Sequence, residues 1–197
     1  MRSDSGTVTF NGTDITNEPP HRICRLGLAR TFQIARPFTG LSVRENIAVG
    51  AYLHVARRDD ALAEANNVAS LLGLDDILDQ QADGLTVASR KRLELARALA
   101  TKPKLLLLDE IFAGLNPTEV EEILPVILEI RGHGVTIVLV EHVMRAVMRL
   151  SDRIVVLNNG EIIAEGLPDA IVSDTRVIEA YLGTSGSGET LAGRSRA

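Results

Sequence analysis

The pattern of hydrophobic and polar positions is most regular in the second half of the chain. Two continuous apolar runs, 105–108 (LLLL) and 135–140 (VTIVLV), enclose a segment whose apolar residues recur at helical spacing. Continuous apolar runs of this length are typical of strands in a parallel sheet that is covered on both faces. The pattern therefore predicts a strand–helix–strand unit over residues 104–140.

The helix of this unit has clear boundaries in the sequence. Asn116 is a good cap residue, Pro117 suits the first helical turn, and Glu119 stands three residues after the cap. We expect the helix to end near Ile130, just before two glycines. Pro125 lies inside it and is expected to bend or split the helix, because proline removes one backbone hydrogen bond.

The remaining elements are shorter, and Asn-Gly pairs at 11–12 and 159–160 predict tight turns between strands. We expect strands at 6–10, 13–15, 28–33, 154–157 and 161–164, and helices at about 21–26, 42–52, 61–72, 75–80, 89–100 and after residue 142. The predicted fold class is α/β, with a mostly parallel core sheet, N-terminal antiparallel strands and a helical subdomain at about 36–101. One domain would span 1–182, and 183–197 would be a flexible tail.

Composition narrows the class of protein. With 197 residues, the chain has room for one domain. Its 26 acidic and 21 basic residues argue against a nucleic-acid binder, since such proteins carry a basic face. No apolar run approaches the roughly 20 residues that span a bilayer, and the polar N-terminus does not resemble a signal peptide. Cys24 has no second cysteine to pair with, so we interpret it as an apolar filler in a cytoplasmic protein.

Polar residues follow both apolar strands at the point where each strand ends. Asp109-Glu110 follows the first strand, and Glu141-His142 follows the second. Parallel strands joined by a crossover end at the same edge of a sheet, where ligands bind, so we expect these side chains to lie together. One carboxylate suits Mg²⁺, a second polarises a water molecule, and a histidine holds that water beside a phosphate. The alternative is that the acid pair only starts a turn and caps the next helix.

Three stretches carry a resemblance to a known family: KLLLLDE (104–110), AGLNPTE (113–119) and VTIVLVEH (135–142). In order and spacing they resemble the nucleotide-binding subunit of ABC transporters, and the resemblance covers about residues 4–183. Within that family, GLARTFQIARPFTGLSVRENIAVGA, KRLELARALATKPKLLLLDE and the C-terminal VIEAYLG are similar to the ATP-binding subunit of branched-chain amino acid importers.

The resemblance implies a P-loop NTPase-like fold and a set of roles around ATP. Asp109 and Gln33 would serve Mg²⁺ and, with Asn116, contact the nucleotide. Glu110 would be the catalytic glutamate and His142 the switch histidine. The signature segment, which binds the γ-phosphate held by the opposing subunit, corresponds to Leu85, Thr86, Val87, Ala88 and Ser89.

The resemblance also implies partners and a location. The partners would be transmembrane permease subunits, a second ATP-binding subunit, either identical or different, and indirectly a periplasmic or extracellular substrate-binding protein. The chain would lie as a peripheral protein on the inner face of the cell membrane.

Two parts of the family pattern are missing or altered. None of the chain's lysines follows the loop G-x-x-x-x-G-K-[ST], whose glycines and lysine hold phosphates. We therefore expect the family's first strand, phosphate loop and first helix to be missing, which would leave part of the core uncovered. The signature segment reads LTVAS where the family has LSGGQ or LSYGQ. Thr86 offers a hydroxyl, but Val87 and Ala88 stand where glycine permits close approach, and Ser89 replaces glutamine.

Two hypotheses therefore stay open. The first is an ATPase subunit that energises an amino acid importer. The second is a truncated, non-hydrolytic pseudoenzyme or fragment that acts at most as a binding subunit. Two local alternatives also stay open. Arg90-Lys91-Arg92 either touches phosphate or is a solvated helix start. A set of apolar residues forms either a groove for a transmembrane partner or internal packing: Phe38, Leu41, Val43, Ile47 and Tyr52.

Overall fold

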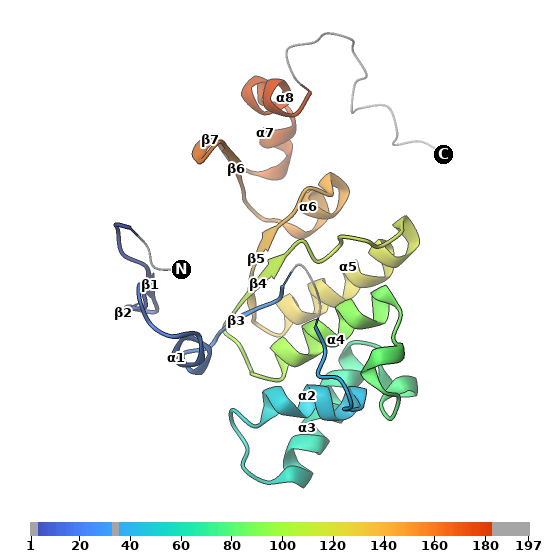
Figure 1. Cartoon of the computed structure of the whole chain (residues 1–197). Coiled ribbons are helices and arrows are strands. Elements are labelled where there is room, and N and C mark those ends of the chain that lie inside the picture. Colours follow the sequence, from blue (N-terminus) through green and yellow to red (C-terminus); the bar gives the residue numbers. More distant parts are fainter. Residues whose placement is uncertain (1–3, 33–35, 183–197) are drawn as a thin grey trace. The chain divides into compact units, whose positions relative to one another are not determined.

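The computed structural model describes residues 4–32 and 36–182. The chain divides into two compact units, 1–146 and 147–197, and each is described by itself. The first unit holds a parallel sheet in the order β3-β4-β5, with helices packed beside it (Figure 1). Its strands are β3 (Leu28–Arg30), β4 (Leu105–Asp109) and β5 (Thr136–Val140). Leu106 in the central strand pairs with Ala29 and Ile137. The predicted parallel strands and the α/β fold class are confirmed.

The N-terminal hairpin is also confirmed. It consists of β1 (Thr9–Phe10) and β2 (Thr13–Asp14), which pair in antiparallel register. Asn11 and Gly12 have φ angles of 47° and 77°. Left-handed backbone at both central positions is what a two-residue type I′ turn requires, and asparagine and glycine adopt it at the lowest cost.

Helices occupy most of the segment between β3 and β5. They are α2 (Val43–Ala51), α3 (Arg58–Leu71), α4 (Val87–Leu99) and α5 (Pro117–Gly132), with 3₁₀ turns at Asp75–Ile77 and Ala82–Gly84, whereas α1 (Pro20–Arg25) precedes β3. The helix predicted at 75–80 is therefore only one 3₁₀ turn. The carbonyls of Leu78 and Gln80 instead accept hydrogen bonds from Arg44 N and Val43 N, at 2.9 and 3.0 Å, and so satisfy donors at the start of α2.

Helix α5 is continuous through Pro125, so of the two expected effects, a bend or a split, the split is wrong. Pro125 lies on the exposed side of the helix. On that side the proline ring does not have to be accommodated in the core. The predicted start is confirmed: Asn116 caps the helix in a reciprocal capping box with Glu119.

The two faces of the parallel sheet differ in coverage. Leu106 and Leu108, which share one face of the sheet, are 0% and 1% exposed. Val138 and Val140, on the opposite face, are 47% and 59% exposed. Within the described residues, the expectation that both faces are covered is therefore wrong, and the exposure agrees with the other expectation, that part of the core is uncovered. A continuous apolar run marks a strand suited to burial on both sides, but it does not show what covers it.

The second unit has its own small core. The hairpin of β6 (Ile154–Asn158) and β7 (Glu161–Gly166) is followed by α7 (Pro168–Val172) and α8 (Thr175–Leu182). Its buried residues are Ile154, Ala164, Ile171 and Val177, with Val147, Met148 and Val156 at the margin. Helix α6 (Met144–Leu150) precedes this hairpin along the chain and spans the boundary between the units. Among the described residues, the helices fall short of the length and apolarity needed for a bilayer span.

The unequal coverage of the sheet predicts unequal costs of truncation. Leu108→Ala leaves a cavity in the buried face and should lower the free energy of unfolding by about 2–5 kcal/mol. Val138→Ala, on the open face, should lower it by only about 0.5 kcal/mol. Urea unfolding of the three proteins measures both values. Similar costs for the two variants would show that the open face is covered in solution.

Candidate functional site

The carboxyl ends of β4 and β5 meet at one rim of the sheet. Asp109 pairs with Val140, and Glu110 N donates a hydrogen bond of 2.9 Å to Val140 O. The Glu141 carboxylate then reaches back, accepting from Phe112 N at 2.9 Å and from His142 N at 3.2 Å. The structure thus brings the acid pair and the Glu-His pair together, with His142 exposed at the rim.

Asp109 is bound to a cation from the neighbouring strand. The Arg30 guanidinium lies 2.8 Å from Asp109 Oδ2, and Asp109 N donates to Thr31 Oγ1 at 3.3 Å. The aspartate side chain is 32% exposed. A partly exposed carboxylate at a strand end fits Mg²⁺, which takes one or two protein carboxylates and keeps other positions for water and phosphate. Within the described residues, no three histidine, cysteine, aspartate or glutamate side chains are grouped so that they could hold a metal ion.

Glu110 has a left-handed backbone, with a φ of 47°. This conformation costs a non-glycine residue about 1–2 kcal/mol. The turn is held on both sides, since its N–H bonds Val140 and its carbonyl accepts from Lys91 Nζ at 3.4 Å. Lys91 is only 4% exposed, so the suggestion of a solvated basic helix start is wrong for this residue.

The signature segment forms the beginning of α4, two residues earlier than predicted. Thr86 is the helix cap: its hydroxyl accepts from Ser89 N at 3.2 Å and donates to Ser89 Oγ at 3.1 Å. Leu85 is buried, whereas Val87 is 50% exposed and Ala88 is half-buried in the first turn. The Thr86 hydroxyl that was expected to replace the family's serine is thus already engaged in capping.

Of the two remaining predicted nucleotide contacts, Asn116 and Gln33, the structure describes only Asn116. Asn116 Oδ1 accepts from Glu119 N at 3.0 Å, so this residue has a structural role as a cap whatever it contacts besides. The nearby Gly114 has a φ of 80°, and a side chain there would meet Val87 Cγ1 at 3.7 Å, which places this turn beside the signature segment. Gln33 lies outside the described residues.

Sequence reasoning missed two charged residues of α4, Glu94 and Arg97. Glu94 is 8% exposed and its Oε1 accepts a hydrogen bond from Phe32 N. Arg97 donates to Arg36 O at 2.8 Å, and its guanidinium lies 4.4 Å from the centre of the Phe38 ring. The signal in the sequence was a glutamate between two leucines in the buried stripe of a helix. Charged residues are seldom fully buried unless they have a partner, so a glutamate in this position indicates a buried contact.

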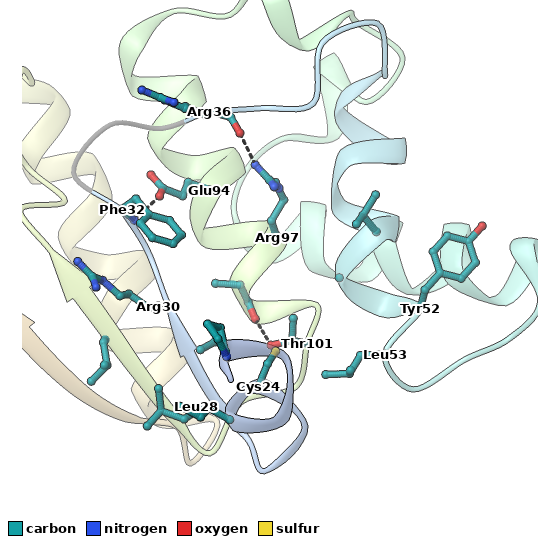
Figure 2. A pocket seen from close by; sticks show the side chains of 17 residues that line it. Cys24, Leu28, Arg30, Phe32, Arg36, Tyr52, Leu53, Glu94, Arg97 and Thr101 are labelled. Carbon is teal, nitrogen blue, oxygen red and sulfur yellow. Dashed lines mark hydrogen bonds between the residues drawn. The ribbon is translucent and has the colours of Figure 1, made fainter. Parts of the chain in front are cut away.

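These two residues line a cavity of about 1190 Å³ between α1, β3, α2 and α4 (Figure 2). Its walls are mostly apolar, from residues such as Ile23, Leu28 and Leu53. Burial raises the pKa of the Glu94 carboxyl above its ordinary value, against the opposing effects of the Phe32 N–H and the Lys91 and Arg97 charges. Burial also disfavours the charged form of Arg97, and it therefore lowers the pKa of the guanidinium.

The apolar residues considered as a partner groove divide into two groups. Val43 and Ile47 are completely buried, so they pack inside the helical segment. Phe38 and Tyr52 are 43% and 47% exposed, and Leu41 is half-buried between these extremes.

Comparisons with known proteins identify the family. The ABC transporter family model matches residues 1–113, and a model for branched-chain amino acid ATP-binding cassette transporters matches 161–186. The Archaeoglobus fulgidus protein named "Probable branched-chain amino acid transport ATP-binding protein LivG" is 37% identical over 198 residues, covering 94% of this chain and 77% of that protein. The Escherichia coli high-affinity branched-chain amino acid transport ATP-binding protein LivG is 37% identical over 194 residues, covering 90% and 76%.

A solved structure shows the same fold. The crystal structure of MJ1267, an ATP-binding cassette of an ABC transporter, matches with a TM-score of 0.83 and 30% identity. The match covers 93% of this chain and 79% of that one.

Backbone strain at Glu110 predicts an unusual preference for glycine. Glu110→Gly and Glu110→Ala both lose the side chain, but only glycine relieves the left-handed conformation. We expect the glycine variant to exceed the alanine variant by about 1 kcal/mol in free energy of unfolding. Urea unfolding measures the difference. An alanine variant of equal or greater stability would show that the turn is not strained in solution.

The buried Glu94 carboxyl predicts a pH-dependent difference from Glu94→Gln, which keeps an acceptor for Phe32 N. Because folding raises the pKa of this carboxyl, the folded protein binds more protons than the unfolded one between the ordinary and the raised pKa. The wild type should therefore lose stability relative to the glutamine variant as pH rises through this window, and match it below. Urea unfolding across pH tests this, and a pH-independent difference would contradict it.

Proposed function

This chain belongs to the ABC transporter family of ATP-binding proteins, and from that premise we propose that it is the ATP-binding subunit that energises an importer of branched-chain amino acids. The substrate class is supported by the LivG relatives, at 37% identity, and by the match of residues 161–186 to the branched-chain model. The observation that carries the chemistry is the rim, where Asp109, Glu110 and the Glu141-His142 pair come together.

At this rim each side chain has a proposed task. Asp109, with Gln33, holds Mg²⁺, and the bound ion neutralises charge that develops on the transferred phosphoryl group. Asp109 must then exchange or share the contact that it makes with Arg30 at 2.8 Å. Glu110 accepts a hydrogen bond from the attacking water and orients it, and the strained turn directs its carboxylate. His142 contacts the γ-phosphate from the exposed position at the end of β5.

The other proposed contacts require a second subunit. Leu85, Thr86, Val87, Ala88 and Ser89 would face the nucleotide held by an opposing ATP-binding subunit, identical or different, with Asn116 nearby. Residues 36–101 would form the helical subdomain of a domain that spans 1–182. The pair of subunits would act on membrane permease subunits from the cytoplasmic face of the membrane, and a substrate-binding protein would deliver the amino acid.

A second candidate function is supported by two specific observations. No phosphate loop of the form G-x-x-x-x-G-K-[ST] occurs in the 197 residues. The first turn of α4 presents Val87, 50% exposed, where the family has glycine. Both favour a chain that does not hydrolyse ATP by itself and acts at most as a binding subunit.

Hydrolysis assays distinguish the two. The 197-residue chain should show no ATP turnover above a protein-free blank. The same chain, extended at its N-terminus by a strand, phosphate loop and helix carrying G-x-x-x-x-G-K-[ST], should turn over ATP. Glu110→Gln should reduce that turnover at least about 100-fold, because it removes the group that polarises water. In cells of Escherichia coli that lack LivG, the extended chain should restore leucine uptake.

Two results would contradict these proposals. Turnover by the 197-residue chain that disappears with Glu110→Gln would exclude the non-hydrolytic alternative. Turnover by the extended chain that survives Glu110→Gln would remove Glu110 from the chemistry.

A further inference from the structure

Helix α4 contacts the chain at two points, one on each side of residues 33–35. Glu94 Oε1 accepts from Phe32 N, before this segment, and Arg97 Nη1 donates to Arg36 O at 2.8 Å, after it. Residues three apart on a helix lie on the same face, so both side chains leave α4 in the same direction. Figure 2 shows Glu94 and Arg97 reaching from the helix to these two backbone groups.

Both contacts are made by charged side chains in places where charge is costly. Glu94 is 8% exposed, and its Oε2 has no hydrogen-bond partner in the described part of the chain. Arg97 is further fixed by the Phe38 ring, 4.4 Å away. An apolar side chain at either position would fill space without the desolvation cost of a charge. Packing alone therefore does not explain why charged residues occupy these positions. Their hydrogen bonds to specific backbone groups do explain it.

We infer that Glu94 and Arg97 form a two-point clamp through which α4 fixes the positions of Phe32 and Arg36. One consequence rests on the proposed function. The clamp connects Phe32, which directly precedes Gln33 in the sequence, to the helix that begins at the signature segment. Thr86 caps the same helix, and about 10 Å of helix axis separates its first turn from Glu94. Glu94 and Arg97 are positioning residues. They act through the backbone next to the nucleotide site and not on the nucleotide.

The clamp itself is testable on the 197-residue chain without any nucleotide. Amide hydrogen exchange at Phe32, measured by NMR, reports the bond to Glu94. Glu94→Ala should accelerate this exchange at least 10-fold, because the acceptor is lost. Glu94→Gln keeps an acceptor oxygen and should remain within about 3-fold of the wild type. For the second point, Arg97→Ala should shift the carbonyl resonance of Arg36 and the ring resonances of Phe38.

Arg92→Ala is the matched control. It removes an arginine from the same helix, but that arginine pairs with Glu122 at 2.9 Å on a different side. It should leave the Phe32, Arg36 and Phe38 signals unchanged. Unchanged exchange at Phe32 in Glu94→Ala would overturn the clamp. So would equal acceleration in Glu94→Ala and Glu94→Gln, since the effect would then come from lost charge and not from the hydrogen bond.

The catalytic consequence is tested in the extended chain. Glu94→Ala should lower kcat for ATP about 10-fold with a smaller change in KM, and Glu94→Gln should restore most of the loss. No turnover by the extended chain would count against the proposed function, while the exchange result would still decide the clamp. Normal kcat in a Glu94→Ala variant with fast Phe32 exchange would overturn the link from the clamp to catalysis.

Discussion

The pairing of β4 with β5 is the constraint on which the rest of the structure depends. Both strands run in the same direction, and Asp109 stands opposite Val140. This register alone brings the acids that follow one strand next to the Glu-His pair that follows the other. A shift by one residue would turn every side chain of a strand to the opposite face, so the register is fixed by the burial of Leu106 and Leu108. The same strand register therefore buries the core leucines and places the site residues side by side.

Charge inside α4 connects the site to the helical segment. This helix begins at the capped signature segment, supports the Glu110 turn through Lys91, and holds the chain next to β3 through Glu94 and Arg97. Each contact ends on a backbone N–H or carbonyl group. Backbone groups are present whatever the side chain, so such contacts position a segment without fixing its sequence.

The sequence was a good guide wherever a local pattern determines structure. The Asn11-Gly12 turn, the Asn116 cap and the apolar runs of β4 and β5 all depend on neighbours in the chain, and the structure follows them. The rim was also predictable, because topology places the ends of adjacent parallel strands together. The roles of the side chains at the rim stay predictions.

What failed depends on contacts between distant segments. Nothing local shows that Arg30, 79 residues before Asp109, would form an ion pair with it. The hydrogen bonds from α2 that replace a helix at 75–80 and the backbone targets of Glu94 and Arg97 are of the same kind. The uncovered face of the sheet is a different case. The apolar runs wrongly predicted cover on both faces, because an apolar run indicates that burial is favourable and not what provides it, whereas the comparison with the family pattern had already predicted an uncovered part of the core.

That uncovered face has a consequence for any work with the isolated chain. β5 is the last strand of the described sheet, and it presents Val138 and Val140 to solvent beside its free edge. Apolar side chains at a strand edge promote adhesion between molecules, which natural proteins usually suppress with charges or a covering element. Dilute solutions and a check of particle size are thus part of handling this molecule, because self-association at this edge would mask the behaviour of the monomer.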